Sequence, residues 1–151
     1  MYDNLDLGLI NKVAIVAGGG SANEEIGNGR AAAILLAEAG CKVLVVDKNE
    51  KSANQTVDII REKNGVAMSV GGDLTIAGAC KKVVNLSIKT WGRHDILDNN
   101  IGIDSRLSVV DETEEYWDRV MDVNLKPIFL MSKFAIPEMI NSGDGGSIVN
   151  I

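Results

Sequence analysis

Glycines near the start of the sequence are spaced as a phosphate-binding turn requires. Glycine occupies positions 18–20 directly after an apolar run, and Gly27 and Gly29 precede an alanine-rich segment. A pyrophosphate needs backbone that approaches it without a Cβ atom, and free N–H groups at a helix N-terminus attract its charge. The pattern therefore predicts a strand, a phosphate-binding turn and a helix. A turn with a purely structural purpose is the alternative for the glycines taken alone.

A carboxylate follows at the position where a nucleotide ribose would lie. Asp47 ends the next apolar run, 18 residues beyond Gly29. At the end of the second strand of such a unit, a carboxylate can accept hydrogen bonds from the ribose hydroxyls of an adenosine, and it would repel a 2′-phosphate. The sequence therefore predicts NAD as the cofactor, with NADP disfavoured. A strand-end or helix-capping role for Asp47 is the alternative.

These residues need a framework that brings the ends of several strands together. Short apolar runs alternate with longer segments that carry apolar residues at helical spacing. This alternation predicts an α/β fold, a doubly wound parallel sheet, in one nucleotide-binding domain over residues 1–151 that is truncated after the fifth strand. Pro127 is expected to bend the last helix. The expected strands are 13–17, 43–46, 66–70, a short strand beginning at 96–97, and 147–151, and the expected helices are 29–39, 50–64, 76–91 and 113–141.

Composition narrows the class of protein. The net charge of −6, without a cluster of Lys or Arg on any expected element, disfavours a nucleic-acid partner. No segment resembles a signal peptide or a membrane span, and Cys41 and Cys80 are expected to be reduced, partly buried thiols. No Cys/His spacing suits a metal, and the single histidine, His94, is expected at the surface rather than in catalysis. The expectation is a cytoplasmic protein that binds no metal, nucleic acid or membrane.

Five motifs follow one another along the sequence: the glycine skeleton of Gly18, Gly27 and Gly29, the pair Asp73-Leu74, and the segments 95–102, 122–125 and 146–151. In this order they resemble the short-chain dehydrogenase/reductase family. The resemblance runs from about Lys12 to the last residue. It implies the nucleotide-binding (Rossmann) part of an NAD-dependent oxidoreductase that transfers hydride between NAD(H) and an alcohol or ketone.

The resemblance also implies roles for particular residues. Asp73 and Leu74 would hold the adenine, and segment 95–102 would end under the nicotinamide ribose. Asn124 would belong to the catalytic tetrad, and the helix over 113–141 would join copies of the chain into a homo-oligomer. The expected cofactor-binding residues are Gly18, Gly20, Ser21, Ile26, Gly27, Gly29, Asp47, Asp73, Leu74, Asn99, Ile101 and Gly102.

The other catalytic residues of that family are absent from these 151 residues. The family's acid/base is a Tyr four residues before a Lys, but Tyr2 is followed by Asp6 and Tyr116 by Val120. Its serine would fall just beyond Ile151, so the chain alone is expected to be inactive. The alternative is a non-catalytic polypeptide that binds a nucleotide or another chain. An end at Ile151 would also uncover apolar residues of the last helix, expected to be Phe129, Met131, Phe134 and Met139.

Four departures from the family pattern stand close to the predicted cofactor. Ala17 replaces a threonine, and residues 19–26 lengthen the phosphate loop and add two glutamates. Asp98 stands where a buried strand normally carries an apolar residue, and an unpaired buried carboxylate is costly. Ile101 replaces a small alanine and could crowd the ribose. These changes bear on the tightness of cofactor binding rather than on the fold.

Overall fold

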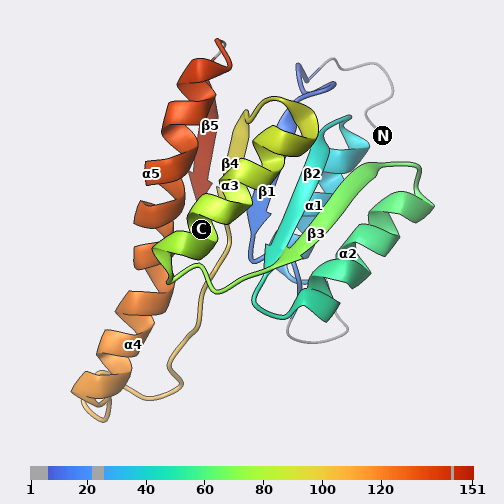
Figure 1. Ribbon diagram of the computed structural model, residues 1–151. Helices are drawn as coiled ribbons and strands as arrows, with labels where there is room; N and C mark the ends of the chain where they lie inside the picture. The colour runs from blue at the N-terminus through green and yellow to red at the C-terminus, as the bar shows by residue number, and fades with distance from the viewer. Residues whose placement is uncertain (1–6, 22–25, 144) are drawn as a thin grey trace.

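The computed structural model describes residues 7–21, 26–143 and 145–151, and in these ranges it is built around a five-stranded sheet (Figure 1). All strands are parallel and lie in the order β3-β2-β1-β4-β5. Their carboxyl ends therefore meet at one edge of the sheet. The elements along the chain are β1 (Val13–Ala17), α1 (Asn28–Glu38), β2 (Lys42–Asp47), α2 (Glu50–Glu62), β3 (Val66–Gly71), α3 (Ala77–Trp91), β4 (Ile96–Asn99), α4 (Glu114–Asn124), α5 (Lys126–Asn141) and β5 (Ser147–Asn150).

Helices cover both faces of the sheet. α1 and α2 pack on one face, and α3 and α5 pack on the other (Figure 1). In β1, Ala14 and Val16 point toward α1 and α2, whereas Ile15 and Ala17 point toward α3 and α5. A strand that is buried on both faces is apolar at every position, which explains the continuous apolar runs of the sequence. The predicted doubly wound α/β fold is confirmed.

Local sequence signals set several helix ends. The Thr113 hydroxyl accepts a hydrogen bond of 3.1 Å from the Tyr116 N–H and caps the start of α4. Two glutamates, Glu114 and Glu115, occupy the first turn, where the helix dipole favours negative charge. At the other end of α3, Gly92 has a φ of 76° and closes the helix as a left-handed residue.

The expected single helix over 113–141 is wrong. The chain forms α4 and α5, which are separated at Leu125. Pro127 lies in the first turn of α5, where its missing N–H costs no intrahelical hydrogen bond, so it begins a helix instead of bending one. α5 packs against α3 and β4, whereas α4 projects past the carboxyl edge of the sheet (Figure 1). Because of this break, α5 can pack into the core while α4 lies at the carboxyl edge of the sheet.

Several expectations about exposure are also corrected. His94 is 0% exposed, so its predicted surface position is wrong. Met131 and Met139 are buried rather than uncovered, because the inward face of α5 packs on α3 and the sheet. Phe134 is partly buried against the same core, while Phe129 is 61% exposed as expected.

Cys41 and Cys80 are not joined by a disulfide, and both are buried rather than partly buried as expected. Burial raises the pKa of Cys41 and of Cys80 to about 11, so neither thiol readily ionises. None of the helices in the described ranges combines the length and apolarity that crossing a lipid bilayer requires.

Candidate cofactor site

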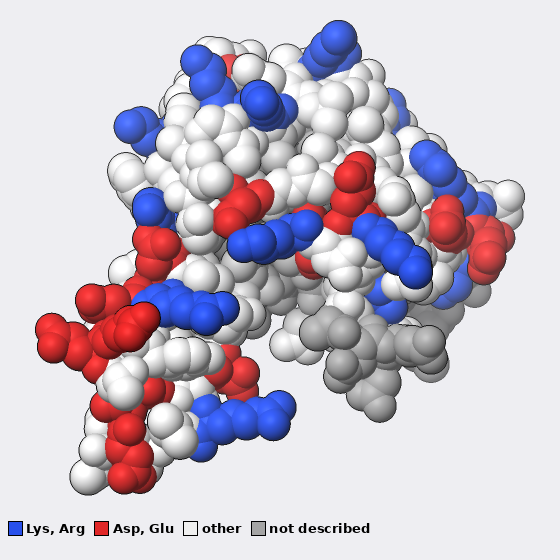
Figure 2. All heavy atoms as spheres, turned by 60° about the horizontal axis from the view of Figure 1, so that its bottom comes forward, with Lys and Arg blue, Asp and Glu red and all other residues white. Residues whose placement is uncertain are grey.

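An open cavity of about 1080 Å³ lies at the carboxyl edge of the sheet. Its size is at the upper end of ligand pockets, which commonly measure roughly 300–1,000 Å³. Figure 2 turns this edge toward the viewer and shows the surface hollowed beside the acidic α4, with Lys and Arg scattered rather than gathered in one patch. Of the twelve residues expected to bind the cofactor, all but Asn99 line the cavity.

The glycine turn after β1 is shaped by close backbone approaches. Gly18 has a φ of 80°, and its N–H donates to the Val46 carbonyl over 2.8 Å. A Cβ atom on Gly29 would lie 2.0 Å from the Gly18 carbonyl oxygen, so the first turn of α1 passes the loop at a distance only glycine allows. Backbone N–H groups at the start of α1 are thereby brought to the cavity. Glu24 and Glu25 of the lengthened loop lie outside the described residues.

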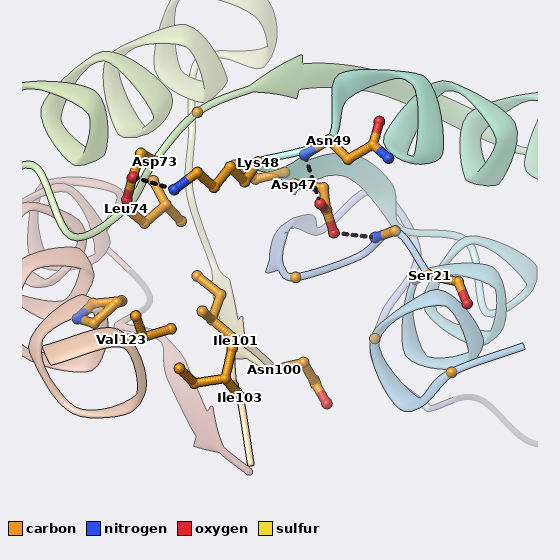
Figure 3. A pocket seen from close by; sticks show the side chains of 18 of the residues that line it. Ser21, Asp47, Lys48, Asn49, Asp73, Leu74, Asn100, Ile101, Ile103 and Val123 are labelled. Carbon is orange, nitrogen blue, oxygen red and sulfur yellow. Dashed lines mark hydrogen bonds and ion pairs between the residues drawn. The ribbon is translucent and has the colours of Figure 1, made fainter. Parts of the chain in front are cut away.

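Asp47 connects the end of β2 to this turn. Its Oδ2 accepts a hydrogen bond of 3.0 Å from the Gly20 N–H, and its Oδ1 accepts one of 2.8 Å from the Asn49 N–H (Figure 3). The carboxylate also borders the cavity. Each carboxylate oxygen has a second lone pair, so these bonds leave acceptor capacity for ribose hydroxyls. Asp47 therefore has the strand-end structural role and the position that a ribose-binding role needs.

Asp73 follows β3 and forms an ion pair across the rim of the cavity. The Lys48 ammonium lies 2.7 Å from Asp73 Oδ2 (Figure 3). The Thr75 hydroxyl donates to Asp73 Oδ1 over 2.7 Å. The hydrogen bond from Lys48, followed by the bonds from Thr75, lowers the pKa of Asp73 to about 2. Lys48 was not among the expected residues, although it directly follows Asp47.

The end of β4 departs from the expectation. Asn99 is 2% exposed and donates to the Asn150 side chain of β5 over 2.8 Å, so it lies beneath the cavity rather than at its wall. Asn100 lines the cavity instead. The alternation of side chains along β4 turns Asn99 toward α5, as it does Leu97.

Asp98 is buried in β4, as its position in the strand predicts. It is 5% exposed, and its Oδ1 has no hydrogen-bond partner in the described part of the chain. Burial raises the pKa of its carboxyl above the usual value, although a hydrogen bond with Asn100 opposes the shift. Asp98, which stands where the family has an apolar residue, therefore places a carboxyl group with a raised pKa directly before the loop that lines the cavity.

Asn124 ends α4 and holds the loop that follows β4. Its side-chain Oδ1 accepts from the Ile103 N–H, and its Nδ2 donates to the Ile103 carbonyl, each over 2.9 Å. Gly102 lies beside the same carboxamide. Asn124 does not itself line the cavity, so its observed contacts position the loop on which Ile101 and Ile103 face the cavity (Figure 3).

Several residues that line the cavity were missed by sequence reasoning. The ones that directly follow β2, β3 and β4 could have been found, because the carboxyl ends of parallel strands meet at one edge. Asp122 and Val123 on α4 belong to segment 122–125, which was matched to the family but not expected to line the cavity, and Pro127 on α5 carried no such signal. The missed lining residues are Val46, Asn28, Lys48, Asn49, Gly72, Thr75, Asn100, Ile103, Asp122, Val123, Pro127 and Ile151.

Residues 12–151 match the family described as short chain dehydrogenase. An uncharacterized oxidoreductase of Thermotoga maritima is 39% identical over 140 residues, which are 93% of this chain and 53% of that protein. A 2,5-dichloro-2,5-cyclohexadiene-1,4-diol dehydrogenase of Sphingobium indicum is 37% identical over 143 residues, or 95% of this chain and 55% of that one.

The fold is likewise shared with solved structures. A 7α-hydroxysteroid dehydrogenase in complex with NADH and 7-oxo glycochenodeoxycholic acid superposes with a TM-score of 0.85 at 33% sequence identity, covering 95% of this chain and 53% of that one. The chain thus spans about half the length of the relatives it matches. The glycine turn, Asp47 and the loop held by Asn124 border one cavity at the carboxyl edge of the sheet. The match over residues 12–151 shows that the chain belongs to the short-chain dehydrogenase family.

Proposed function

We propose that this chain is the NAD(H)-binding part of an oxidoreductase that interconverts an alcohol and a ketone. The observation that carries the proposal is the Asp47 carboxylate, which borders the cavity while it accepts a hydrogen bond from the glycine turn. A carboxylate that can accept hydrogen bonds from ribose hydroxyls would thus lie beside the glycine turn that would bind the pyrophosphate. The negative charge of this carboxylate would disfavour a 2′-phosphate. NADP(H) is the less favoured cofactor.

Each part of the cavity suits a part of the dinucleotide. The glycine turn and the start of α1 would bind the pyrophosphate, Asp47 the adenosine ribose, and Asp73 with Leu74 the adenine. Ile101 and Gly102 would border the nicotinamide ribose, on the loop that Asn124 holds. The bound dinucleotide would supply hydride-transfer chemistry, while these residues bind and orient it.

The proposed substrate class rests on the relatives. Their names describe a cyclohexadiene-diol dehydrogenase and a hydroxysteroid dehydrogenase, whose substrates carry hydroxyl or keto groups. Deprotonating an alcohol requires an acid/base, and these 151 residues hold no Tyr four positions before a Lys. We therefore propose the activity for a protein of the relatives' length, in the cytoplasm, and cofactor binding for the present chain.

The first test is calorimetric titration of the 151-residue chain with NAD. We expect saturable binding and no NADH formation from a panel of secondary alcohols. Gly29→Ala should abolish binding, because its Cβ would lie 2.0 Å from the Gly18 carbonyl oxygen. Gly78→Ala is the matched control, since a Cβ at this helical position meets nothing within 4 Å. Circular dichroism should show both variants folded; absence of NAD binding by the unmodified chain would refute the proposal.

We further propose that copies of the chain associate through α4 and α5. A stripe of exposed apolar side chains follows these helices at helical spacing, and an apolar surface of this kind favours association. Met121→Glu with Phe129→Glu should reduce the particle mass measured by light scattering, because buried charges oppose docking. A monodisperse monomer of the unmodified chain at high concentration would contradict this. The stripe consists of Trp117, Met121, Leu125, Phe129, Ile136 and Ile140.

A further inference from the structure

Arg30 carries a buried positive charge without a matching carboxylate. The residue is 3% exposed, and its guanidinium donates from Nε to the Thr56 hydroxyl over 3.0 Å and from Nη2 to the Ser52 hydroxyl over 3.2 Å. A longer bond of 3.4 Å reaches the Gln55 side-chain oxygen. All of these acceptors are neutral, and among the described residues no carboxylate lies within ion-pair distance of Arg30. Burying such a charge is costly unless an anion offsets it.

Two hydroxyl groups link this guanidinium to the phosphate loop. The Thr56 hydroxyl donates to the Gly19 carbonyl over 2.8 Å. The Ser52 hydroxyl accepts from the Ser21 N–H over 2.6 Å and donates to the Ser21 carbonyl over 2.7 Å. Ser21 lines the cavity, but Arg30, Ser52 and Thr56 do not. The guanidinium therefore lies behind the loop, on the side away from the cavity.

Asp47 approaches the same loop without forming an ion pair with Arg30. A Cβ on Gly20 would lie 2.6 Å from Asp47 Oδ2 and 2.8 Å from the Ser52 hydroxyl, so both groups flank Gly20. The two Asp47 oxygens accept from the N–H groups of Gly20 and Asn49 instead of from the guanidinium. The carboxylate thus binds the loop and forms no ion pair with the guanidinium.

We propose that the buried charge of Arg30 stabilises the pyrophosphate of the bound dinucleotide through the loop that it braces. This rests on the proposed NAD(H) binding. A guanidinium remains charged in proteins, and a charge shielded from water acts over several ångströms with less screening by salt. A pyrophosphate on the far side of the loop would supply an anion for this buried cation, which has no carboxylate within ion-pair distance among the described residues. Arg30 is therefore a positioning and electrostatic residue rather than a direct ligand.

The test compares three ligands by calorimetry: NAD, inorganic pyrophosphate and adenosine. Arg30→Met should weaken NAD and pyrophosphate by about tenfold, a typical effect of one nearby charge, and leave adenosine unchanged. Arg30→Gln, which keeps a hydrogen-bonding side chain, should show the same loss, whereas Arg30→Lys should retain most of the affinity. Arg61→Met is the matched control, because Arg61 lies on α2 and donates to the Ala67 carbonyl away from the cavity.

The outcomes separate this proposal from the one on which it rests. If Arg30→Met and Arg30→Gln weaken adenosine as much as pyrophosphate, or weaken neither, the electrostatic role of Arg30 is overturned while NAD binding stands. If the unmodified chain binds pyrophosphate in an Arg30-dependent way but not NAD, the role of Arg30 holds and NAD binding fails. If it binds neither ligand, both are overturned. Circular dichroism identifies the variants that fold, and only these are compared. If Arg30→Met does not fold, Arg30→Gln provides the same test.

Discussion

NAD(H) should bind this chain at least about tenfold more tightly than NADP(H), and Asp47→Asn should remove most of the difference. The asparagine keeps an oxygen that can accept from the Gly20 N–H, which Asp47 Oδ2 now binds at 3.0 Å. It loses the negative charge that opposes a 2′-phosphate. NADP(H) affinity should therefore rise, and NAD(H) affinity should fall only slightly. Calorimetric titration with both cofactors measures the two changes.

Two further variants separate charge from loop geometry. Asp47→Ala removes both hydrogen-bond acceptors, so the Gly20 and Asn49 N–H groups lose their partner and NAD affinity should fall well below that of Asp47→Asn. Asp58→Asn removes one negative charge from the exposed face of α2, which does not border the cavity, and should change neither affinity. Equal affinities of the unmodified chain for the two cofactors would show that Asp47 does not select between them.

The second large effect concerns acid stability. Burial lowers the pKa of His94 from 6.5 to about 4, with partial opposition from the Asp95 carboxylate. Between those values the unfolded chain binds a proton at this side chain that the folded chain does not. The free energy of unfolding should therefore decrease as the pH falls through this window, by about 3 kcal/mol in total. Urea unfolding at pH values above, within and below the window measures the loss.

His94→Leu should flatten this dependence. Both ring nitrogens of His94 are buried without hydrogen-bond partners among the described residues, so leucine should also raise stability at neutral pH. Asp98 contributes with the opposite sign, because its folded-state pKa is raised and its protonation favours the folded chain as the pH falls. Asp98→Asn should consequently steepen the loss. An unchanged acid dependence in His94→Leu would assign the effect to other groups.

Much of the fold follows from local sequence signals. β1 is a continuous apolar run followed by glycines, and β2 contains the apolar run 43–46 and ends at Asp47. The expected helix ranges agree with the structure where capping is local, as at the start of α4 after Thr113 and the end of α3 before Gly92. Strict alternation of strands and helices then leaves few topologies, because parallel crossovers share one hand. For this reason the glycine turn and Asp47 were placed correctly relative to the sheet.

Other features depended on packing between distant segments. The Lys48–Asp73 ion pair requires β2 and β3 to be neighbours, and the network of Arg30 requires α1 to pack on α2. The burial of His94 likewise reflects its place among α3, α5 and the start of β4, since its backbone N–H reaches the Ser142 hydroxyl of the α5 end. The spacing of apolar residues within one segment does not indicate contacts between segments that are distant in sequence.

The sequence by itself determined the order of the elements, the doubly wound sheet and the residues that follow each strand, because these depend on side-chain period and turn chemistry within short windows. Only the tertiary structure decided that Asn99 turns beneath the cavity while Asn100 lines it, and that the chain breaks at Leu125 so that α5 joins the core. The physical reason is that both features depend on the burial of surfaces from segments far away in sequence. Such burial sets the direction of a side chain at a strand end, and it decides whether a helix bends or breaks.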